Sequence, residues 1–266
     1  MDIKGKIFGL FFDIDGTVLG EDMNAYEESI AAIQKVRSLG HKCFVATGRA
    51  TAYIPDFLNA EKNFDGVVSG AGTTIKIGDR LINEEYVPFE DVERFCEYTF
   101  KHKTPSILEG REHMYHFGNG EGIHHNSVHL DIADHWILVT EENYKDIITP
   151  DIQIEKFTVM GQLEPELDDV FGPNYHVFRH PAYGEAIQKK CGKDKAIQIV
   201  MDELGLPVSQ SIAMGDSMND YDMVKFAGFG VAMGQGSEEL KKIADMVTDT
   251  ANNAGVKVAL KKIFNF

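Results

Sequence analysis

The sequence predicts an α/β fold in which a doubly wound parallel sheet is interrupted by an inserted α+β unit. Apolar runs that read as buried strands alternate with helical patterns up to residue 82, and the same alternation resumes at residue 186. Between them, short strand-like runs with many histidines follow a different pattern. The 266 residues also exceed the roughly 100–150 of a common single domain. We therefore expect a core formed by residues 1–82 and 186–266, with an insert formed by 83–185.

The first core elements can be assigned in chain order. Residues 7–12 form a nearly continuous apolar run that ends in a glycine-containing turn, the pattern of a strand buried on both faces of a sheet. Apolar residues at helical spacing predict a helix over 26–39, with Gly40 as its C-terminal cap. Two further apolar runs, at 42–46 and 67–68, each lead into a segment with glycine. This order of strands and helices is typical of a doubly wound sheet.

The insert and the second core segment follow by the same reasoning. In the insert we expect a helix over 90–102, short strands at 157–161 and 176–179, and a helix near 165–171 between those strands. No element is assigned over 105–136, where several glycines interrupt the pattern. The elements expected after residue 185 are a helix over 193–204, a strand at 211–214, a loop at 215–220, a strand near 229–232 and a helix from Val256.

The composition excludes several classes of protein. A formal net charge of −16 argues against a nucleic-acid partner, because backbone phosphates are held by clustered Lys and Arg. The three cysteines, Cys43, Cys96 and Cys191, are spaced neither as a zinc site nor as a disulfide framework, so reduced thiols are expected. No apolar run approaches the ~20 residues of a membrane span, and Asp13 and Asp15 interrupt the apolar start. We expect a soluble cytoplasmic protein with no membrane partner.

Two aspartates, Asp13 and Asp15, follow the first predicted strand. In open α/β sheets, ligands bind at the carboxyl ends of the strands. Residues i and i+2 of an extended segment project to the same side, so the two carboxylates share one small volume. Both can stay ionised there only with a cation or an available proton, and Mg²⁺, which prefers oxygen ligands, meets that need. A turn or helix-capping role for the pair is the alternative.

Three other segments carry polar groups at strand ends or at a helix start. Thr47 and Gly48 follow a strand, where a hydroxyl and an amide suit phosphate oxygens or, alternatively, cap a helix. Lys193 opens a predicted helix and suits an anion, although basic clusters are often solvated surface. The acidic loop 215–220 follows another strand, and acidic turns are common. Four such signals at successive positions favour one shared site.

Together these motifs make the sequence resemble the haloacid dehalogenase superfamily, and within it the Cof-type, sugar-phosphatase-like branch with a type C2B cap. The signature Asp-x-Asp-Gly-Thr matches residues 13–17, Thr-Gly-Arg matches 47–49, the downstream lysine matches Lys193, and Gly-Asp-x-x-Asn-Asp matches 215–220. The motifs occur in the required order, and the resemblance covers essentially the whole chain. It implies a Rossmann-like core with an inserted cap, and a magnesium-dependent phosphatase for a sugar phosphate or similar small phosphate ester.

The resemblance also implies a role for each matched residue. Asp13 would attack phosphorus and become an aspartyl phosphate, and Asp15 would act as acid and base. Mg²⁺ would be held by the Asp13 carboxylate, the Asp15 backbone carbonyl and Asp216, with Asp220 supporting Lys193 or the metal shell. Lys193 would also be catalytic, because it neutralises charge on the transferring group. The residues implied to bind the phosphoryl group or substrate are Ile14, Thr47, Gly48, Arg49, Lys193 and Asn219.

Two positions depart from the family pattern. Family members often read Ser-Asn-Gly-Ala after the third strand, whereas Ala71 stands here where the asparagine is usual. The lysine of the third motif is usually followed by glycine, but Asp194 follows Lys193. Three nearby lysines are therefore rival assignments, although the small and apolar residues that follow favour Lys193; the rivals are Lys189, Lys190 and Lys195.

The insert would select the substrate, and several of its residues are candidates for that task. Six histidines there could recognise a leaving group or bind a transition metal, but their spacing fits no zinc motif, so surface or core positions are preferred. They are His113, His116, His124, His125, His129 and His135. Arg111 and Arg179 are weaker candidates for an anionic substrate, and Trp136 is expected to be a packing residue.

Two other functions use similar residues. A phosphotransferase or mutase would share Asp13 but would need to exclude water and offer a second acceptor. A non-enzymatic phospho-acceptor domain of the receiver type would need neither Asp15 nor an insert of this size. The small-molecule phosphatase is preferred, as a monomer, because its own insert would complete the active site.

Overall fold

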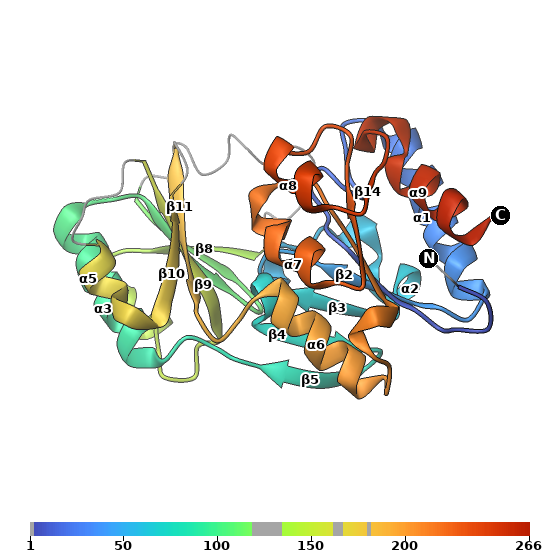
Figure 1. The fold of residues 1–266 in the computed structure, drawn as a ribbon. Coiled ribbons are helices and arrows are strands. Elements are labelled where there is room, and N and C mark those ends of the chain that lie inside the picture. Colours follow the sequence, from blue (N-terminus) through green and yellow to red (C-terminus); the bar gives the residue numbers. More distant parts are fainter. Residues whose placement is uncertain (1–2, 119–134, 162–166, 180–181) are drawn as a thin grey trace. The chain divides into compact units, whose positions relative to one another are not determined.

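The computed structural model describes residues 3–118, 135–161, 167–179 and 182–266. The chain divides into two compact units, drawn with the chain coloured along its length in Figure 1. The first unit comprises residues 1–48, 59–83 and 192–266, and the second comprises 49–58 and 84–191. Each unit has its own sheet and its own core.

These boundaries differ from the expected ones in three places, since residues 49–58 and 186–191 belong to the second unit and Asn83 belongs to the first. The first segment is held there by Thr51, whose amide and hydroxyl both donate to the buried carboxylate of Glu155, at 2.8 and 2.7 Å. The second segment continues a strand of the second sheet as far as Gln188. Sequence pattern does not reveal either attachment because both depend on contacts between distant parts of the chain.

Eight strands form the sheet of the first unit, in the order β14-β13-β12-β1-β2-β3-β4-β5. Adjacent strands from β14 to β3 are parallel, and β4 runs antiparallel to β3. In chain order the strands are β1 (Gly9–Phe12), β2 (Lys42–Ala46), β3 (Gly66–Ser69), β4 (Thr74–Ile77), β5 (Arg80–Glu84), β12 (Ser211–Gly215), β13 (Phe229–Ala232) and β14 (Met246–Val247). The predicted parallel core is confirmed, with an antiparallel extension at one edge.

Helices cover both faces of this sheet. On one face, α6, α7 and α8 pack on a core that includes the stacked rings of Phe11 and Phe44. On the other face, α9 brings Phe264 against Phe8, and α1 lies beside α9 (Figure 1). The helices are α1 (Met23–Ser38), α2 (Ala60–Asn63), α6 (Lys193–Glu203), α7 (Tyr221–Phe226), α8 (Glu238–Ile243) and α9 (Gly255–Phe264), with the 3-10 turns η3 (Gly70–Gly72), η6 (Val208–Gln210), η7 (Met218–Asp220) and η8 (Ala251–Asn253).

Local sequence explains where α1 begins and ends. The side chain of Asp22 accepts hydrogen bonds from the amides of Asn24 and Ala25, so the helix starts three residues before the expected Tyr26. At the other end Gly40 adopts a positive φ of 96°, which a glycine reaches without strain, and its amide donates to the Arg37 carbonyl.

The second unit contains a six-stranded sheet in the order β10-β11-β9-β6-β7-β8. Its strands are antiparallel except for the parallel pair β7 and β8. In chain order the elements are the 3-10 turns η1 (Thr51–Tyr53) and η2 (Asp56–Leu58), α3 (Phe89–His102), β6 (Ser106–Gly110), β7 (Met114–Phe117), β8 (Trp136–Val139), α4 (Tyr144–Ile147), β9 (Ile154–Met160), α5 (Leu167–Phe171), η5 (Gly172–Asn174), β10 (Tyr175–Arg179) and β11 (Tyr183–Gln188).

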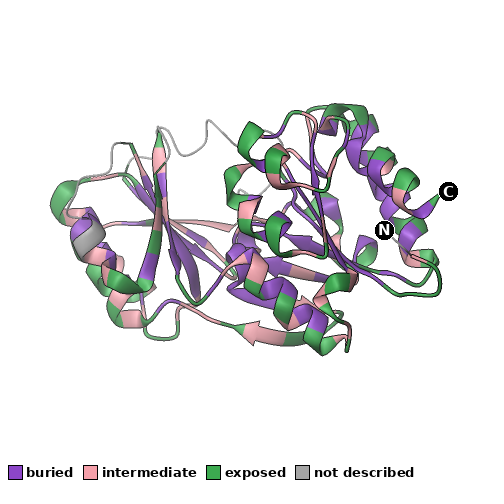
Figure 2. Ribbon diagram, viewed as in Figure 1, coloured by how far each residue is buried: buried purple, intermediate pink, exposed green. Residues whose placement is uncertain are grey.

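The core of the second unit lies between its sheet and the helices α3, α4 and α5. Phe95 of α3 stacks on Phe157 of β9, with 4.6 Å between ring centroids, and on Phe171 of α5. Figure 2 shows the buried residues concentrated in the strands and on the inner sides of the helices. Among the described residues, no helix is both long and apolar enough to cross a membrane.

Candidate active site

The motifs meet at the carboxyl end of the first unit's sheet. Phe12, the last residue of β1, is in register with Val45 of β2 and with Met214 of β12. Since these strands are parallel and adjacent, the segments that follow them emerge at one edge. Asp13 therefore lies between the segments that begin with Thr47 and Asp216.

Asp13 is buried and held by a lysine. Its side chain is 5 % exposed, and its Oδ1 accepts a hydrogen bond of 2.7 Å from Nζ of Lys193. The same ammonium donates to Oδ1 of Asp220 at 2.6 Å. Lys193 is the first residue of α6, so this helix delivers the ammonium from the neighbouring layer to the end of the central strand. Both flanking carboxylates raise the pKa of Lys193 against the opposing effect of burial.

Three carboxylates come together at this position. Oxygens of Asp13, Asp216 and Asp220 all lie within 4.8 Å of one another. Burial and the charge of Asp220 raise the pKa of Asp13 well above its ordinary value, although Lys193 opposes the shift. The same two causes raise the pKa of Asp216 to about 6. Removal from water and mutual repulsion thus disfavour the ionised forms.

The residues present fit a hard divalent cation. Three ionised carboxylates and one ammonium leave a net charge of −2 in this cluster, which a divalent cation would balance. Both oxygens of Asp220 already accept hydrogen bonds, Oδ1 from Lys193 and Oδ2 from the amides of Asp216 and Ser217. This leaves Asp13 and Asp216 as the carboxylates best placed to bind the ion, with oxygen donors that Mg²⁺ prefers.

Gly16 is a necessary part of this arrangement. It adopts a positive φ of 73°, and a Cβ at this position would lie 2.3 Å from Oδ2 of Asp216. The backbone that follows Asp15 can approach the Asp216 carboxylate this closely only because residue 16 has no side chain. The glycine of the Asp-x-Asp-Gly-Thr signature thus has a steric reason.

Asn219 lies close to Gly48, which follows Thr47 after β2. The amide nitrogen Nδ2 of Asn219 would be 3.7 Å from a Cβ at Gly48. The hydroxyl of Ser217 donates to Oδ1 of Asn219 at 2.6 Å, which orients the amide so that Nδ2 remains as a donor. Thr47 is buried, and its amide donates to the Val68 carbonyl. Donors from two different strand ends can therefore face one anion.

The structure distinguishes between the rival lysines. Lys193 is buried against Asp13, whereas Lys190 pairs with Glu85 in the second unit. Lys189 and Lys195 are exposed. The assignment that the following apolar residues favoured is the one whose ammonium reaches the strand end.

Ala71 has a conformational rather than a side-chain role. It adopts a left-handed conformation with φ 54° and ψ 37° inside η3, and its amide donates to the Thr47 carbonyl at 3.0 Å. Asparagine is one of the residues that tolerate this conformation best. The usual asparagine thus fits the backbone here, and alanine keeps the same turn at some strain.

The remaining predicted site residues lie in different surroundings. Ile14 is buried, with its carbonyl accepting from the amides of Thr17 and Leu19, while Asp15 is exposed. Arg49 is grouped with the second unit, where its guanidinium donates to the Tyr53 carbonyl and lies over the Tyr53 ring. Direct phosphate or substrate contacts by Ile14 and Arg49 stay predictions.

The candidates within the insert take mainly structural positions. Arg111 donates to Glu84 and to the hydroxyl of Tyr86. Trp136 packs edge-on against Tyr53, as a packing residue is expected to do. Arg179 is exposed at the end of β10. Among the histidines, His113, His116 and His135 are described, and they make ring contacts with neighbouring aromatic residues or with one another; His124, His125 and His129 lie outside the described residues.

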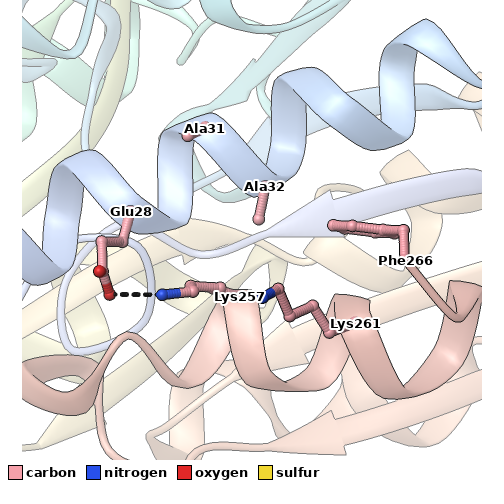
Figure 3. A pocket seen from close by; sticks show the side chains of 6 residues that line it. All are labelled: Glu28, Ala31, Ala32, Lys257, Lys261 and Phe266. Carbon is pink, nitrogen blue, oxygen red and sulfur yellow. Dashed lines mark ion pairs between the residues drawn. The ribbon is translucent and has the colours of Figure 1, made fainter.

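A cavity of about 240 Å³ lies between α1 and α9 (Figure 3). Glu28 and Lys257 form an ion pair of 2.9 Å across it, and the small side chains of Ala31 and Ala32 leave the space open. None of its lining residues belongs to the strand-end cluster. The cavity therefore adds no group to the candidate active site.

One segment of the site was missed from the sequence. Residues 233–237 follow β13, and the Ser237 amide donates to the carbonyl of Asp216 at 2.9 Å. The side chain of Gln235 donates to the carbonyl of Gly16. The signal was available, because β13 was itself predicted and its carboxyl end adjoins that of β12.

Comparison with known proteins agrees with this geometry. A family model described as haloacid dehalogenase-like hydrolase matches residues 10–260. The chain therefore belongs to the haloacid dehalogenase-like hydrolases, and the resemblance and the enzyme class expected from the motifs are confirmed.

Individual relatives cover the chain almost completely. A 5-amino-6-(5-phospho-D-ribitylamino)uracil phosphatase of Bacillus subtilis, YitU, is 26% identical over 99% of this chain and 100% of its own. The solved structure of the subclass IIB sugar phosphatase BT4131 is 25% identical, with a TM-score of 0.80 over 97% of this chain and 100% of its own. BT1666 of Bacteroides thetaiotaomicron, described among phosphatases of this superfamily, is 26% identical, with a TM-score of 0.78 over 100% and 99% of the two chains.

Proposed function

We propose that this chain hydrolyses a small phosphate monoester, such as a sugar phosphate, with Mg²⁺ as cofactor. The observation that carries the proposal is the buried cluster at the end of β1, where Lys193 bridges Asp13 and Asp220 beside Asp216. A nucleophilic carboxylate, a fixed cation and a metal-binding carboxylate are the groups that suit phosphoryl transfer through an aspartyl phosphate. Relatives that act on phosphate esters, including a sugar phosphatase, support the substrate class.

In the proposed reaction each of these side chains has a role. A carboxylate oxygen of Asp13 attacks phosphorus, the bond from phosphorus to the leaving oxygen breaks, and Asp15 gives that oxygen a proton. Water then attacks the aspartyl phosphate while Asp15 takes its proton, which releases phosphate and restores Asp13. Asp15 is exposed and can exchange protons with solvent between these steps. Lys193, with Asn219 and the amide of Gly48, stabilises the charge on the phosphoryl oxygens.

Mg²⁺, held by Asp13, the Asp15 carbonyl and Asp216, would neutralise negative charge on the transferring phosphoryl group. Thr47 follows β2 on the phosphate side of the cluster, and Asp220 holds Lys193 in place. The second unit, residues 49–58 and 84–191, is proposed to select the leaving group. A monomer in the cytoplasm, with no nucleic-acid partner, stays the expected state.

The test is phosphate release from a panel of sugar phosphates and other phosphate esters, with Mg²⁺ or EDTA. We expect magnesium-dependent release that Asp13→Asn abolishes. Lys193→Met should lower kcat by roughly 10²–10³-fold, which is the usual effect of removing one group that stabilises charge in the transition state. Lys195→Met, the same substitution at an exposed position two residues away, should stay within about twofold of the wild type.

Two results would contradict the proposal. The first is a folded wild-type protein that binds Mg²⁺ and releases no phosphate from any ester. The second is phosphate transfer to an added alcohol in place of release, which would indicate a phosphotransferase. Asp15→Asn separates the remaining alternative, since a phospho-acceptor domain would still accept phosphate on Asp13 at the wild-type rate.

A further inference from the structure

The loop at residues 233–237 is fixed to the backbone of the metal-binding segment. The amide of Met233 donates to the carbonyl of Gly215, and the amide of Ser237 donates to the carbonyl of Asp216, both at 2.9 Å. The amide of Gly234 donates to the carbonyl of Asp249 at 3.0 Å. The loop between β13 and α8 is therefore hydrogen-bonded on two sides, and the backbone positions from which its side chains extend are fixed.

Gln235 extends from this loop to the turn that carries Asp15. Its Nε2 donates to the carbonyl of Gly16, and its Oε1 accepts from the amide of Ala251 at 3.1 Å. One partner is an acceptor and the other is a donor, and the primary amide of Gln235 satisfies both, which a carboxylate of the same length cannot do. Ala251 is the first residue of η8. The side chain of Asn252 in the same turn accepts from the amide of Glu21 at 2.7 Å, so the turn that bonds Gln235 is itself held in place.

Gly16 is the flexible point next to Asp15. Glycine has the widest choice of backbone conformations, and here it is held at a φ of 73°. Its amide donates to the carbonyl of Leu19 at 2.8 Å, and its carbonyl accepts from Gln235. With both of its polar groups bonded, Gly16 is held in this conformation by two hydrogen bonds. The direction in which the Asp15 side chain leaves the backbone is then fixed relative to Asp13.

We propose that Gln235 is a positioning residue for Asp15, acting through the Gly16 carbonyl; this inference rests on the proposed function. Without Gln235, the Asp13–Asp220 cluster and Lys193 keep their hydrogen bonds, because none of them involves Gln235. What is lost is the bond to the Gly16 carbonyl, while the Gly16 amide stays bonded to Leu19, so the group that protonates the leaving oxygen is held less firmly in its direction. Since Gln235 is exposed, its removal has little effect on the fold.

A positioning role for Gln235 predicts that the loss of activity depends on the leaving group of the substrate, whereas a purely structural role predicts the same loss on every substrate. An alkyl phosphate, such as a sugar phosphate, leaves as an alkoxide and needs a proton in the transition state. p-Nitrophenyl phosphate leaves as a stable phenolate and does not. We measure kcat/KM, which reports the step that forms the aspartyl phosphate, for the best sugar phosphate and for p-nitrophenyl phosphate.

Gln235→Ala should lower kcat/KM about tenfold on the sugar phosphate and less than about twofold on p-nitrophenyl phosphate. The tenfold loss is a part of the ~10²–10⁴-fold rate enhancement that a correctly placed general acid supplies. Gln235→Glu should lose as much, because its carboxylate still accepts from Ala251 but cannot donate to Gly16. Gln210→Ala is the matched control: Gln210 is half-buried, and its Nε2 also donates to a backbone carbonyl, that of Ile7, at 2.7 Å. It should keep both values.

Equal losses on the two substrates, no loss on either, or full activity of Gln235→Glu would each overturn the positioning role while leaving the hydrolase intact. A wild-type protein that is inactive on both substrates would instead overturn the proposed function, and this inference with it. Circular dichroism and the unfolding temperature of each variant confirm that the comparison is made on folded protein.

Discussion

At the scale of single residues, the candidate site contains two buried side chains of opposite charge. Lys193 and Asp13 are both nearly inaccessible, and a buried ion pair contributes little net stability because removing the charges from water offsets their attraction. Burial, and then the charge of Asp220, raise the pKa values of Asp13 and Asp216, and one ammonium is shared by three carboxylates. Such a cluster is explained better by a ligand than by the fold.

His41 is a buried residue that affects stability instead. Its Nδ1 accepts from the amide of Phe8 at 3.2 Å, and its ring contacts those of Phe8 and Phe264. Burial lowers the pKa of His41 below its ordinary value. Because the unfolded chain then binds a proton more readily, this contribution is complete above the unfolded pKa of about 6.5 and is lost as the pH falls through the folded pKa.

His41→Asn tests this linkage, since the asparagine Oδ1 can still accept from the Phe8 amide and does not titrate. The stability advantage of the wild type over the variant should shrink between pH 7.5 and pH 5, by no more than about 1.4 kcal/mol per pH unit, the limit for one proton. Urea unfolding at each pH measures both proteins, and the titration of all other groups cancels in the difference. A difference that is constant with pH would contradict the assignment.

At the scale of elements, the end of α3 is strained. Lys103 closes this helix in a left-handed conformation, φ 51° and ψ 35°, with its amide bonded to the Thr99 carbonyl. The exposed side chain has no burial to lose, and the conformation costs a non-glycine residue about 1–2 kcal/mol. Lys103→Gly should raise the free energy of unfolding by roughly 0.5–1 kcal/mol, after the greater freedom of glycine in the unfolded chain is subtracted.

Lys101→Gly is the matched control for this change. Lys101 is also exposed but lies within the helix, so the same substitution should lower stability by up to about 1 kcal/mol. Trp136, the only tryptophan, lies in β8 of the same unit, and its fluorescence follows the unfolding of that unit. If Lys103→Gly and Lys101→Gly shift the urea midpoint in the same direction, the left-handed conformation of Lys103 is not the cause of the stability change.

The sequence predicted elements well where periodicity was strong and poorly at sheet edges. The strands of the parallel core read as continuous apolar runs because both of their faces are buried, and β1 and β12 were assigned within two residues. The strand β5 at the sheet edge and its neighbour β4 were missed, because β5 is short and largely exposed and β4 has only four residues, two of them buried. In the second unit, β6 and β7 fall in the glycine-rich stretch that received no assignment.

The candidate site was more predictable than the fold of the second unit, because the carboxyl ends of adjacent parallel strands meet at one edge of the sheet independently of how the helices pack. That rule placed Asp13, Thr47 and Asp216 near one another before any side chain was known. It could not reveal that Asp220 has both oxygens bonded, or that Arg49 is bonded to Tyr53. Such details depend on rotamers and on long-range contacts, which leave no periodic signal.

At the scale of the whole molecule, the net charge of −16 complicates any experiment with Mg²⁺. A strongly acidic chain is destabilised by repulsion between its own charges, and any salt relieves part of it. At an ionic strength of 0.1 M, charges more than about 10 Å apart are already screened. A specific metal site must therefore be recognised by an effect beyond that of ionic strength.

We expect Mg²⁺ to raise the unfolding temperature of the first unit more than NaCl does at equal ionic strength. A ligand at 100 times its dissociation constant adds about 2.7 kcal/mol of stability, and domains of 150–250 residues gain about 2–4 °C per kcal/mol. Calorimetry should thus show a specific rise of several degrees in the wild type. Asp216→Asn, which removes one carboxylate from the cluster of three, should respond equally to both salts, because only the screening effect remains. An equal response of the wild type to both salts would show that the cluster does not bind Mg²⁺, and a specific rise retained by the variant would place the ion elsewhere on this acidic surface.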